Sequence, residues 1–523
     1  MIRPKILLND LQELVRRLED DLRERCDHHA DLDAPLRAEW DKARHAHRTD
    51  HPYETWRDDR LTQIGVAWVL AATFVRFCED NDLIDVRLAG PGERLRLARE
   101  RRTAHFAAHP AHNDRDYLLT IFEEMAALAP TARLYDRTNP LWELAPSADA
   151  CSELLDAFTR LGEAGYLAHD FTDPELGTRF LGDLYQDLSE HAREAYALLQ
   201  TPEFVEEFIL DRTLDPAIDD FGLDHTTLID PACGSGHFLL GAFDRIFSRR
   251  RQRHPGANPV EHAIATFGAI AGVDLNPYAV AVARFRLLIA ALTACGIRRL
   301  VAAPDFNVQV AAGDSLLHGP RAHQLLDDAD YAGEAYRHLY VTEDRPLLQR
   351  ILGQRYTVVV GNPPYITVKD SAANEAYRRR YGSCKGTYSM GVPFTERFFD
   401  LTIAPEQPDE PCGYVGMITT NSFMKREFGS KLVEEYLPMW GLSTVIDTSG
   451  AYLPGHGTPT VIVIGRSRAT TGDTVRAVMG IRGEPSTPAD PAKGAVWTAI
   501  VDQVDRPGSE SRYVVSLDWP RTR

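Results

Sequence analysis

The sequence contains 523 residues, of which 44% are hydrophobic and 26% are charged. This length exceeds one compact domain, and the balance is typical of a globular protein. No apolar run approaches the roughly 20 residues of a membrane-spanning helix, and the N terminus lacks the apolar core of a signal peptide. We therefore expect a cytoplasmic protein with no membrane partner. The net charge of −18 excludes a generally basic surface but not a local basic cleft.

The cysteines indicate neither disulfides nor a metal site. All seven are scattered along the chain, and none stands in the close pairs that are typical of a zinc knuckle. Their odd number also disfavours a complete disulfide framework. We expect reduced, mostly buried thiols and no bound metal.

The first part of the chain has helical periodicity. Apolar side chains that recur every three or four residues lie on one face of a helix. This pattern is formed by Leu7, Leu11, Leu14, Leu18 and Leu22. Further apolar stretches at 64–77 and 117–128 extend the pattern, and none of these segments carries catalytic chemistry. We predict an N-terminal α-helical domain over residues 1–195.

After residue 199, short β-branched segments alternate with helical ones. The predicted strands are 226–229, 270–273, 306–311, 356–360, 414–419, 442–447 and 460–464. Strands that alternate with helices indicate an α/β fold with a Rossmann-like, mostly parallel sheet. We predict that this seven-strand sheet occupies residues 196–470. Residues 471–523 are rich in Gly and Pro, which predicts an irregular tail or the start of a truncated recognition region.

A glycine loop follows the first predicted strand. The segment Asp230-Pro231-Ala232-Cys233-Gly234-Ser235-Gly236 joins that strand to a helix. Its glycines allow the backbone to turn sharply and to approach a ligand closely. The second and third strands end at Asp274 and Asp314, so three acids meet at one sheet edge. A nicotinamide site is the weaker interpretation, because its fingerprint places the acid about 20 residues after the glycines and has three glycines.

The fourth predicted strand ends in Asn362-Pro363-Pro364-Tyr365. The two prolines cannot continue a sheet, so the strand stops there. The exocyclic amine of adenine is a poor nucleophile, because its lone pair is delocalised into the ring. The Asn362 side-chain oxygen and the Pro363 carbonyl could accept hydrogen bonds from both of its N–H groups and free the lone pair for reaction. Tyr365 offers an aromatic face for a base that has left the duplex.

Together these motifs resemble the amino-methyltransferases of the gamma motif order. The resemblance implies a methyltransferase sheet, S-adenosylmethionine as cofactor and double-stranded DNA as substrate. The segment that contains Thr201 and Pro202 resembles the family's upstream motif, which lies against the methionine end of the cofactor. By the same resemblance, the cofactor loop is formed by Pro231, Cys233, Gly234 and Gly236. Asp230 would contact the methionyl amine, Asp274 the ribose and Asp314 the adenine amine.

The N-terminal helices are similar to those of the adenine methyltransferase of bacteriophage exclusion (BREX) systems. The resemblance implies that other BREX components are partners. A basic cluster, Arg378, Arg379, Arg380 and Lys385, follows the catalytic motif, and we expect it to contact DNA phosphates. None of the lysines has an acid two residues before it, so we expect no fused nuclease. Only about 55 residues follow the last motif, too few for a full recognition domain, which is expected of a truncated form.

Two other functions are compatible with the same motifs. Asn-Pro-Pro-Tyr also serves methyl transfer to the amide nitrogen of protein glutamine, although the long helical N terminus favours DNA. A scaffold that binds the cofactor without turnover is the second alternative. Transfer to adenine-containing duplex, transfer to a glutamine peptide, or neither, separates the three functions.

Overall fold

In a computed structural model, the chain is described for residues 2–162, 165–188, 200–319, 338–407, 409–455, 457–470 and 472–520. Its centre is one ten-stranded sheet in the order β3-β2-β1-β4-β5-β7-β6-β8-β10-β9. The strands are β1 (Leu228–Asp230), β2 (Ile270–Asp274), β3 (Gln309–Ala312), β4 (Val358–Gly361), β5 (Tyr414–Thr420), β6 (Trp440–Asp447), β7 (Thr460–Ala469), β8 (Thr474–Gly480), β9 (Ser509–Glu510) and β10 (Val514–Pro520). The chain is thus a mixed α/β protein, as the sequence predicts.

The first five strands are all parallel, and the strand order reverses between β1 and β4. The next strand in the sheet, β7, runs antiparallel to β5 and to β6. Because β1 continues to β2 on one side and β4 to β5 on the other, a crevice opens where β1 and β4 end. Open α/β sheets bind ligands at this topological switch point.

Apolar side chains cover both faces of the sheet. On one face, Leu228 and Val358 belong to a core shared with α11 (His237–Arg253), α12 (Pro259–Ala269) and α13 (Pro277–Cys295). On the other face, Ile229 and Val359 belong to a second core, shared with α15 (Arg345–Leu352), α16 (Ser371–Arg380) and α17 (Gly391–Leu401). Successive strand residues point to opposite faces, so short all-apolar strands are expected for a doubly covered sheet.

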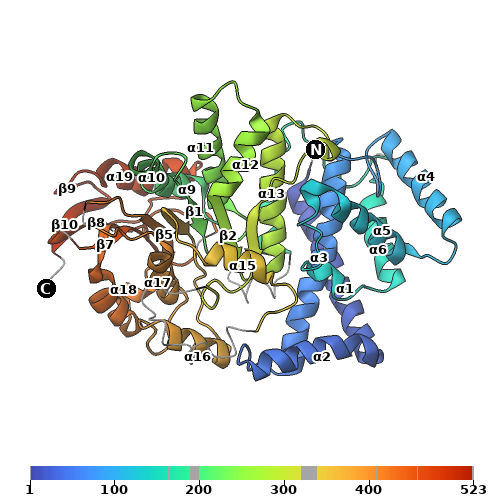
Figure 1. Cartoon of the computed structure of the whole chain (residues 1–523), viewed down its shortest axis with the longest axis horizontal. Helices are drawn as coiled ribbons and strands as arrows, with labels where there is room; N and C mark the ends of the chain where they lie inside the picture. Colours follow the sequence, from blue (N-terminus) through green and yellow to red (C-terminus); the bar gives the residue numbers. More distant parts are fainter. Residues whose placement is uncertain are drawn as a thin grey trace.

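The N-terminal segment is helical, as predicted. Its helices are α1 (Pro4–His28), α2 (Ala30–His45), α3 (Tyr53–Asp80), α4 (Glu93–Ala108), α5 (Asp114–Ala127), α6 (Ala148–Thr159) and α7 (Arg179–Asp187). The predicted leucine stripe of α1 is buried. Figure 1 shows these helices, in blue and cyan, beside α13 and the sheet. The boundary predicted at residue 195 lies outside the described residues.

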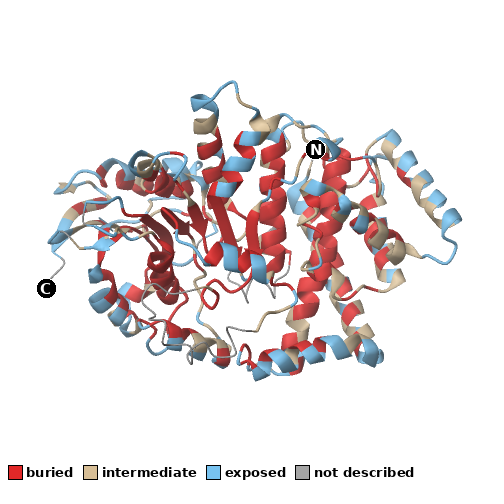
Figure 2. Cartoon of the chain, viewed as in Figure 1, coloured by how far each residue is buried: buried red, intermediate tan, exposed pale blue. Residues whose placement is uncertain are grey.

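Helix α3 joins the N-terminal helices to the sheet. Its Phe74 ring stacks on Phe285 of α13 with 4.3 Å between the ring centroids. Both helices are long and apolar enough to cross a membrane, but α3 is buried throughout its apolar stretch and α13 through two thirds of its own. Figure 2 shows this burial, in contrast to the largely exposed α4. One hydrophobic core therefore runs from α1 to the sheet, as expected for core helices of a globular protein.

Two expectations are corrected here. Each of the seven predicted strand segments overlaps an observed strand, but the sheet has ten strands rather than seven. The extra strands, β8, β9 and β10, lie in residues 471–523, where an irregular tail was one of the two expectations. Gly480 is the last residue of β8, and Gly472 lies two residues before this strand. A further helix, α19 (Ala495–Gln503), follows the prolines.

Candidate active site

The glycine loop connects β1 to α11 at the switch point. The Cys233 N–H donates to the Val273 carbonyl (3.0 Å), which attaches the loop to β2. Gly236 precedes α11 with a φ of 84°, a conformation that side-chain-bearing residues rarely adopt. A Cβ at this position would also lie 3.1 Å from the Cβ of Ala283. Glycine therefore allows the loop to turn and α11 to pack closely on α13.

Two of the three acids accept hydrogen bonds from backbone N–H groups of this loop. Asp230 is 2% exposed, and its Oδ1 accepts a hydrogen bond from the Ala232 N–H (3.0 Å). Burial raises its pKa well above the ordinary value. Asp274 accepts from the Gly234 N–H (2.8 Å) and the Asn276 N–H (2.9 Å), and burial raises its pKa to about 6. A buried carboxylate with few donors is costly unless a cation or further donors arrive.

The third acid has a different environment. Asp314 Oδ1 accepts from the Leu316 and Leu317 N–H groups, at 2.9 and 3.1 Å. Its Oδ2 accepts from the Tyr377 hydroxyl of α16 at 2.7 Å. In this structure Asp314 therefore connects the end of β3 to α16.

The predicted catalytic motif begins directly after β4. Asn362 and Tyr365 are partly exposed, and Pro363 is buried between them. Burial of the hydroxyl raises the pKa of Tyr365, which keeps the phenol neutral. The Met390 N–H donates to the Ile366 carbonyl (2.8 Å) and attaches the end of the motif to the start of α17. The motif thus projects from the sheet edge next to the glycine loop.

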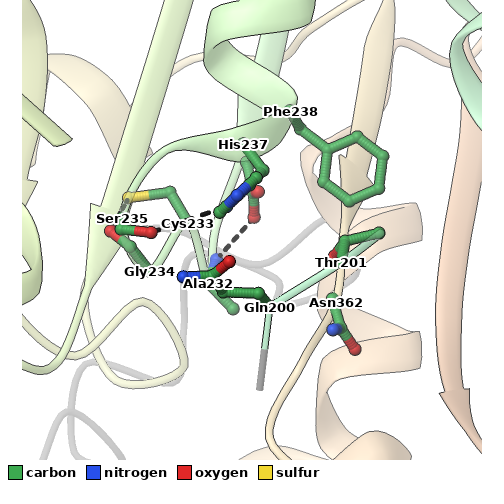
Figure 3. Close-up of a pocket in the computed structure, with 10 residues that line it drawn as sticks. Gln200, Thr201, Ala232, Cys233, Gly234, Ser235, His237, Phe238 and Asn362 are labelled. Carbon is green, nitrogen blue, oxygen red and sulfur yellow. Dashed lines mark hydrogen bonds between the residues drawn. The ribbon is translucent and has the colours of Figure 1, made fainter. Parts of the chain in front are cut away.

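A pocket that is partly open to solvent lies between the glycine loop and the catalytic motif. Its lining residues are Gln200, Thr201, Asp230, Ala232, Cys233, Gly234, Ser235, His237, Phe238 and Asn362. In Figure 3, Asn362 lies on the same side as Thr201 and Phe238, whereas Cys233, Gly234 and Ser235 lie on the opposite side. Residues from three separate chain segments therefore share one cavity.

Five of the predicted site residues line this pocket, namely Thr201, Asp230, Cys233, Gly234 and Asn362. Pro202, Pro231 and Pro363 are their chain neighbours, Gly236 lies between the lining residues Ser235 and His237, and Pro364 and Tyr365 follow in the catalytic motif. Asp274 contacts the loop by accepting a hydrogen bond from the Gly234 N–H. Asp314 is not among the lining residues.

Sequence reasoning did not assign His237 and Phe238 to the site. Both belong to the first turn of α11, directly after the glycine loop, so their position beside that loop was the available signal. Burial, with smaller contributions from Arg286 and Arg179, lowers the pKa of His237 well below its ordinary value. A neutral imidazole therefore lies in the pocket, with its Nδ1 3.5 Å from Ser235 Oγ.

Arg286 of α13 supports the loop from below. It is 5% exposed, and its Nη1 donates to the Ser235 carbonyl (2.8 Å) and to Ser235 Oγ (3.3 Å). A charged donor on a backbone carbonyl is stronger than a neutral one. Arg286 gave no motif signal, because only the fold brings α13 under the loop.

The predicted basic cluster is only partly at the surface. Arg378, Arg379 and Lys385 are exposed, and Lys385 lies 3.4 Å from Glu427. Arg380 is buried, and its guanidinium donates to the carbonyls of Leu317 (2.7 Å) and Gly319. Its expected contact with DNA is therefore wrong for this conformation. Neighbouring helix residues point about 100° apart, so three in succession cannot share one face.

Within the described ranges, no group of three His, Cys, Asp or Glu side chains could hold a metal ion.

Comparisons with known proteins agree with the motif resemblance. Residues 269–451 match the profile of the Eco57I restriction-modification methylase family. The whole chain is 46% identical to the adenine-specific methyltransferase PglX of Streptomyces coelicolor and covers 45% of it. It is 26% identical over 53% of its length to the type II methyltransferase M.PaeR7I of Pseudomonas aeruginosa, of which it covers 42%. The chain thus spans less than half the length of these curated relatives.

A solved structure shares the fold. The ATP-dependent type ISP restriction-modification enzyme LlaBIII, bound to DNA, aligns with a TM-score of 0.52 and 14% identity. The alignment covers 90% of this chain and 30% of that enzyme.

Proposed function

Because the chain is similar along its whole length to the adenine-specific methyltransferase PglX, we propose that it methylates the N6 amine of adenine in DNA. The proposed methyl donor is S-adenosylmethionine, and the proposed substrate is double-stranded DNA. One observation carries the proposal: β1 and β4 are neighbours, so Asp230 and Asn362 line the same pocket. A cofactor site and a base site must meet in this way for methyl transfer.

The chemistry of the pocket fits the cofactor. Burial raises the pKa of Asp230 because it disfavours the charged carboxylate. A cationic amine beside it would stabilise that charge. Asp274 is a second acceptor behind the loop, suited to ribose hydroxyls, and Thr201 adds a polar side chain at the pocket wall. S-adenosylmethionine combines a cationic amine, ribose hydroxyls and an apolar linker. Asp314 is the weakest of the proposed contacts, since Tyr377 and two backbone N–H groups already bind it.

Catalysis by this chain would rest on positioning. Bound S-adenosylmethionine supplies an electrophilic methyl group on a sulfonium. The Asn362 amide oxygen and the Pro363 carbonyl would accept hydrogen bonds from the two N–H groups of the adenine amine. This would direct the lone pair of the amine toward the methyl group. Tyr365, a neutral phenol, stacks on the base that has left the duplex. Such preorganised acceptors lower the barrier without a covalent intermediate.

The finer architecture is also part of the proposal. We assign the methyltransferase core to the seven strands from β3 to β6 in the sheet order, with a helical domain before residue 195. The strands after residue 470 are an addition to this core.

The proposed biological role is methylation in the cytoplasm as part of a BREX-type phage defence, with other BREX components as partners. This part rests on the similarity to PglX and on the N-terminal helices.

A radiolabelled methyl-transfer assay tests which substrate, if any, the chain methylates. The purified chain is incubated with methyl-tritiated S-adenosylmethionine and a pool of random-sequence duplexes, and nucleosides are separated by chromatography. Label in N6-methyladenine that disappears in Asn362→Ala supports the proposal. Label in a glutamine peptide but not in DNA would instead indicate a protein methyltransferase. Cofactor binding with no transfer to either substrate would indicate a scaffold.

A further inference from the structure

A short turn between two N-terminal helices contacts the chain a few residues after the catalytic motif. This turn, residues 46–52, joins α2 to α3 and contacts Asp370, the residue before α16. Residues 362–369, which we call the catalytic loop, run from the end of β4 to Asp370. Figure 1 shows α2 and α16 side by side, although they lie more than 300 residues apart in the sequence.

The Asp370 carboxylate accepts hydrogen bonds both from the start of α16 and from the turn between α2 and α3. Its Oδ1 accepts from the N–H groups of Ala372 (2.9 Å) and Ala373 (3.1 Å), so it caps the N terminus of α16. Its Oδ2 accepts from the Thr49 hydroxyl (2.5 Å) and the Asp50 N–H (3.0 Å), which also lies 3.1 Å from Oδ1, and His51 Nε2 lies 3.6 Å from Oδ2. Capping requires one oxygen, and the second oxygen is committed to the α2–α3 turn.

The turn itself is firmly held. Arg48 and Glu343 form a buried ion pair (3.2 Å) in which each side chain is 3% exposed. Burial opposes the charge on Glu343, but Arg48 and further hydrogen bonds hold its pKa at about 2. Arg48 also donates to the His338 carbonyl at 3.0 Å. Ser371 Oγ donates back to Asp50 at 2.7 Å, which closes a reciprocal contact with α16.

The far end of α16 is attached to the sheet edge. Tyr377 donates to Asp314 (2.7 Å), and Tyr381, the residue after α16, donates to the Leu316 carbonyl (2.7 Å). Within the catalytic loop, one backbone bond reaches the rest of the fold, from Met390 to Ile366. The Asn374 side chain of α16 also donates to the Val368 carbonyl (3.4 Å). The loop is therefore attached to β4 at one end and, through Asp370 and Asn374, to the start of α16 at the other.

We propose that the Thr49–Asp370 contact holds the catalytic loop in its working position. Asp370 is then a positioning residue, and its partner Thr49 comes from the turn between two N-terminal helices. This inference rests on the proposed function. It assigns the N-terminal helices a direct part in methyl transfer, in addition to their part in the core. Loss of the contact should lower turnover and leave the cofactor pocket intact, since neither Thr49 nor Asp370 lines that pocket.

Two variants of the full chain test the proposal. Thr49→Ala removes the hydroxyl. Asp370→Asn keeps a capping oxygen, but it removes the charged acceptor of the Thr49 hydroxyl and turns an amide N–H toward the Asp50 N–H. Thr49→Ser restores the hydroxyl and is the rescue variant. Asp490→Asn is the matched control, because Asp490 caps a short helix through the Ala492 N–H (3.1 Å) and pairs with Lys493 of the same helix (2.9 Å).

Amide hydrogen exchange and methyl transfer are measured on each variant. In Thr49→Ala and Asp370→Asn, exchange over residues 366–373 should accelerate about tenfold or more. Turnover on the duplex pool should fall about tenfold or more, and cofactor affinity should stay within about twofold. Thr49→Ser and Asp490→Asn should match the original chain in all three measurements.

Each other outcome has a definite meaning. Unchanged exchange, or unchanged turnover with accelerated exchange, overturns the positioning role. A parallel loss of cofactor affinity also overturns it, because the contact would then be a general structural one. If the original chain transfers no methyl group but exchange accelerates as expected, the proposed function fails and the ordering of the loop by Thr49 and Asp370 stands.

Discussion

Gly361, the last residue of β4, lies against Asp230, the last residue of β1. A Cβ added to Gly361 would stand 2.5 Å from Asp230 Oδ1 and 3.0 Å from Cζ of Phe398. Phe398 is fully buried in α17 and cannot move aside without disturbing the core. The Asp230 carboxylate thus occupies the space that a side chain at position 361 would fill.

The first prediction follows from this contact. Gly361→Ala should displace Asp230 and weaken S-adenosylmethionine binding, and overpacking should lower the free energy of unfolding by about 1–3 kcal/mol. Gly268→Ala is the control, because a Cβ there meets nothing within 4 Å. Calorimetry and thermal unfolding measure both effects. Normal cofactor affinity in Gly361→Ala would show that the Asp230 carboxylate does not contribute to binding.

The second prediction concerns protons. Burial raises the pKa of Asp230 well above its ordinary value, so this carboxyl should bind a proton at higher pH than an ordinary one, and a bound cationic amine should favour release of that proton. Cofactor affinity should therefore rise with pH and fall as the carboxyl becomes protonated. Calorimetry in buffers of different ionisation enthalpy should detect the proton release. Asp230→Asn should abolish it, and 5′-methylthioadenosine, which lacks the amine, should release none.

The third prediction concerns Asn362. Asn362→Ala should lower turnover by about 100-fold or more, because one of two acceptors for the adenine amine is lost. Cofactor affinity should change little, since the charged contacts proposed for the cofactor come from Asp230 and Asp274. Single-turnover methylation and calorimetry separate the two effects. Near-normal turnover in this variant would remove Asn362 from the catalytic centre.

The fourth prediction separates stacking from activation. Tyr365→Ala should slow methylation through a loss of roughly 1–3 kcal/mol of stacking on the base. A mismatch opposite the target adenine makes extrusion easier and should partly restore Tyr365→Ala but not Asn362→Ala. Equal rescue of both variants would contradict the division of roles between these residues.

The fifth prediction tests the three arginines separately. Replacing Arg378 and Arg379 with Ala should reduce the slope of log affinity for DNA against log salt by up to about 2 units. Arg380→Ala should leave that slope unchanged and destabilise the fold by about 1–3 kcal/mol, because the Leu317 and Gly319 carbonyls lose their donor. A changed slope for Arg380→Ala alone would require a conformation in which this side chain is exposed.

The parts of the fold that the sequence predicts correctly are those with local signals. The glycine loop at Gly234 and Gly236 and the strand end at Pro363 need only their own neighbours to be identified. Arg380 and Asp314 were assigned to ligands from their position in the chain, but Arg380 donates to the carbonyls of Leu317 and Gly319, and Asp314 accepts from the distant Tyr377 as well as from two neighbouring N–H groups. Arg286 and Thr49 carry no motif at all, and only the folded chain brings them to the loops that they hold.

The added strands affect where this protein can be divided. Trp497 of α19 packs edge-on against Phe204 and Phe208, at 4.8 and 5.3 Å between ring centroids. Both phenylalanines belong to α9 (Glu203–Asp211), which begins one residue after the Thr201-Pro202 segment at the pocket. A recombinant fragment cut at residue 470 would expose these rings and loosen the wall of its own cofactor site. Domain exchange between relatives should therefore keep α19, α9 and the Thr201-Pro202 segment together.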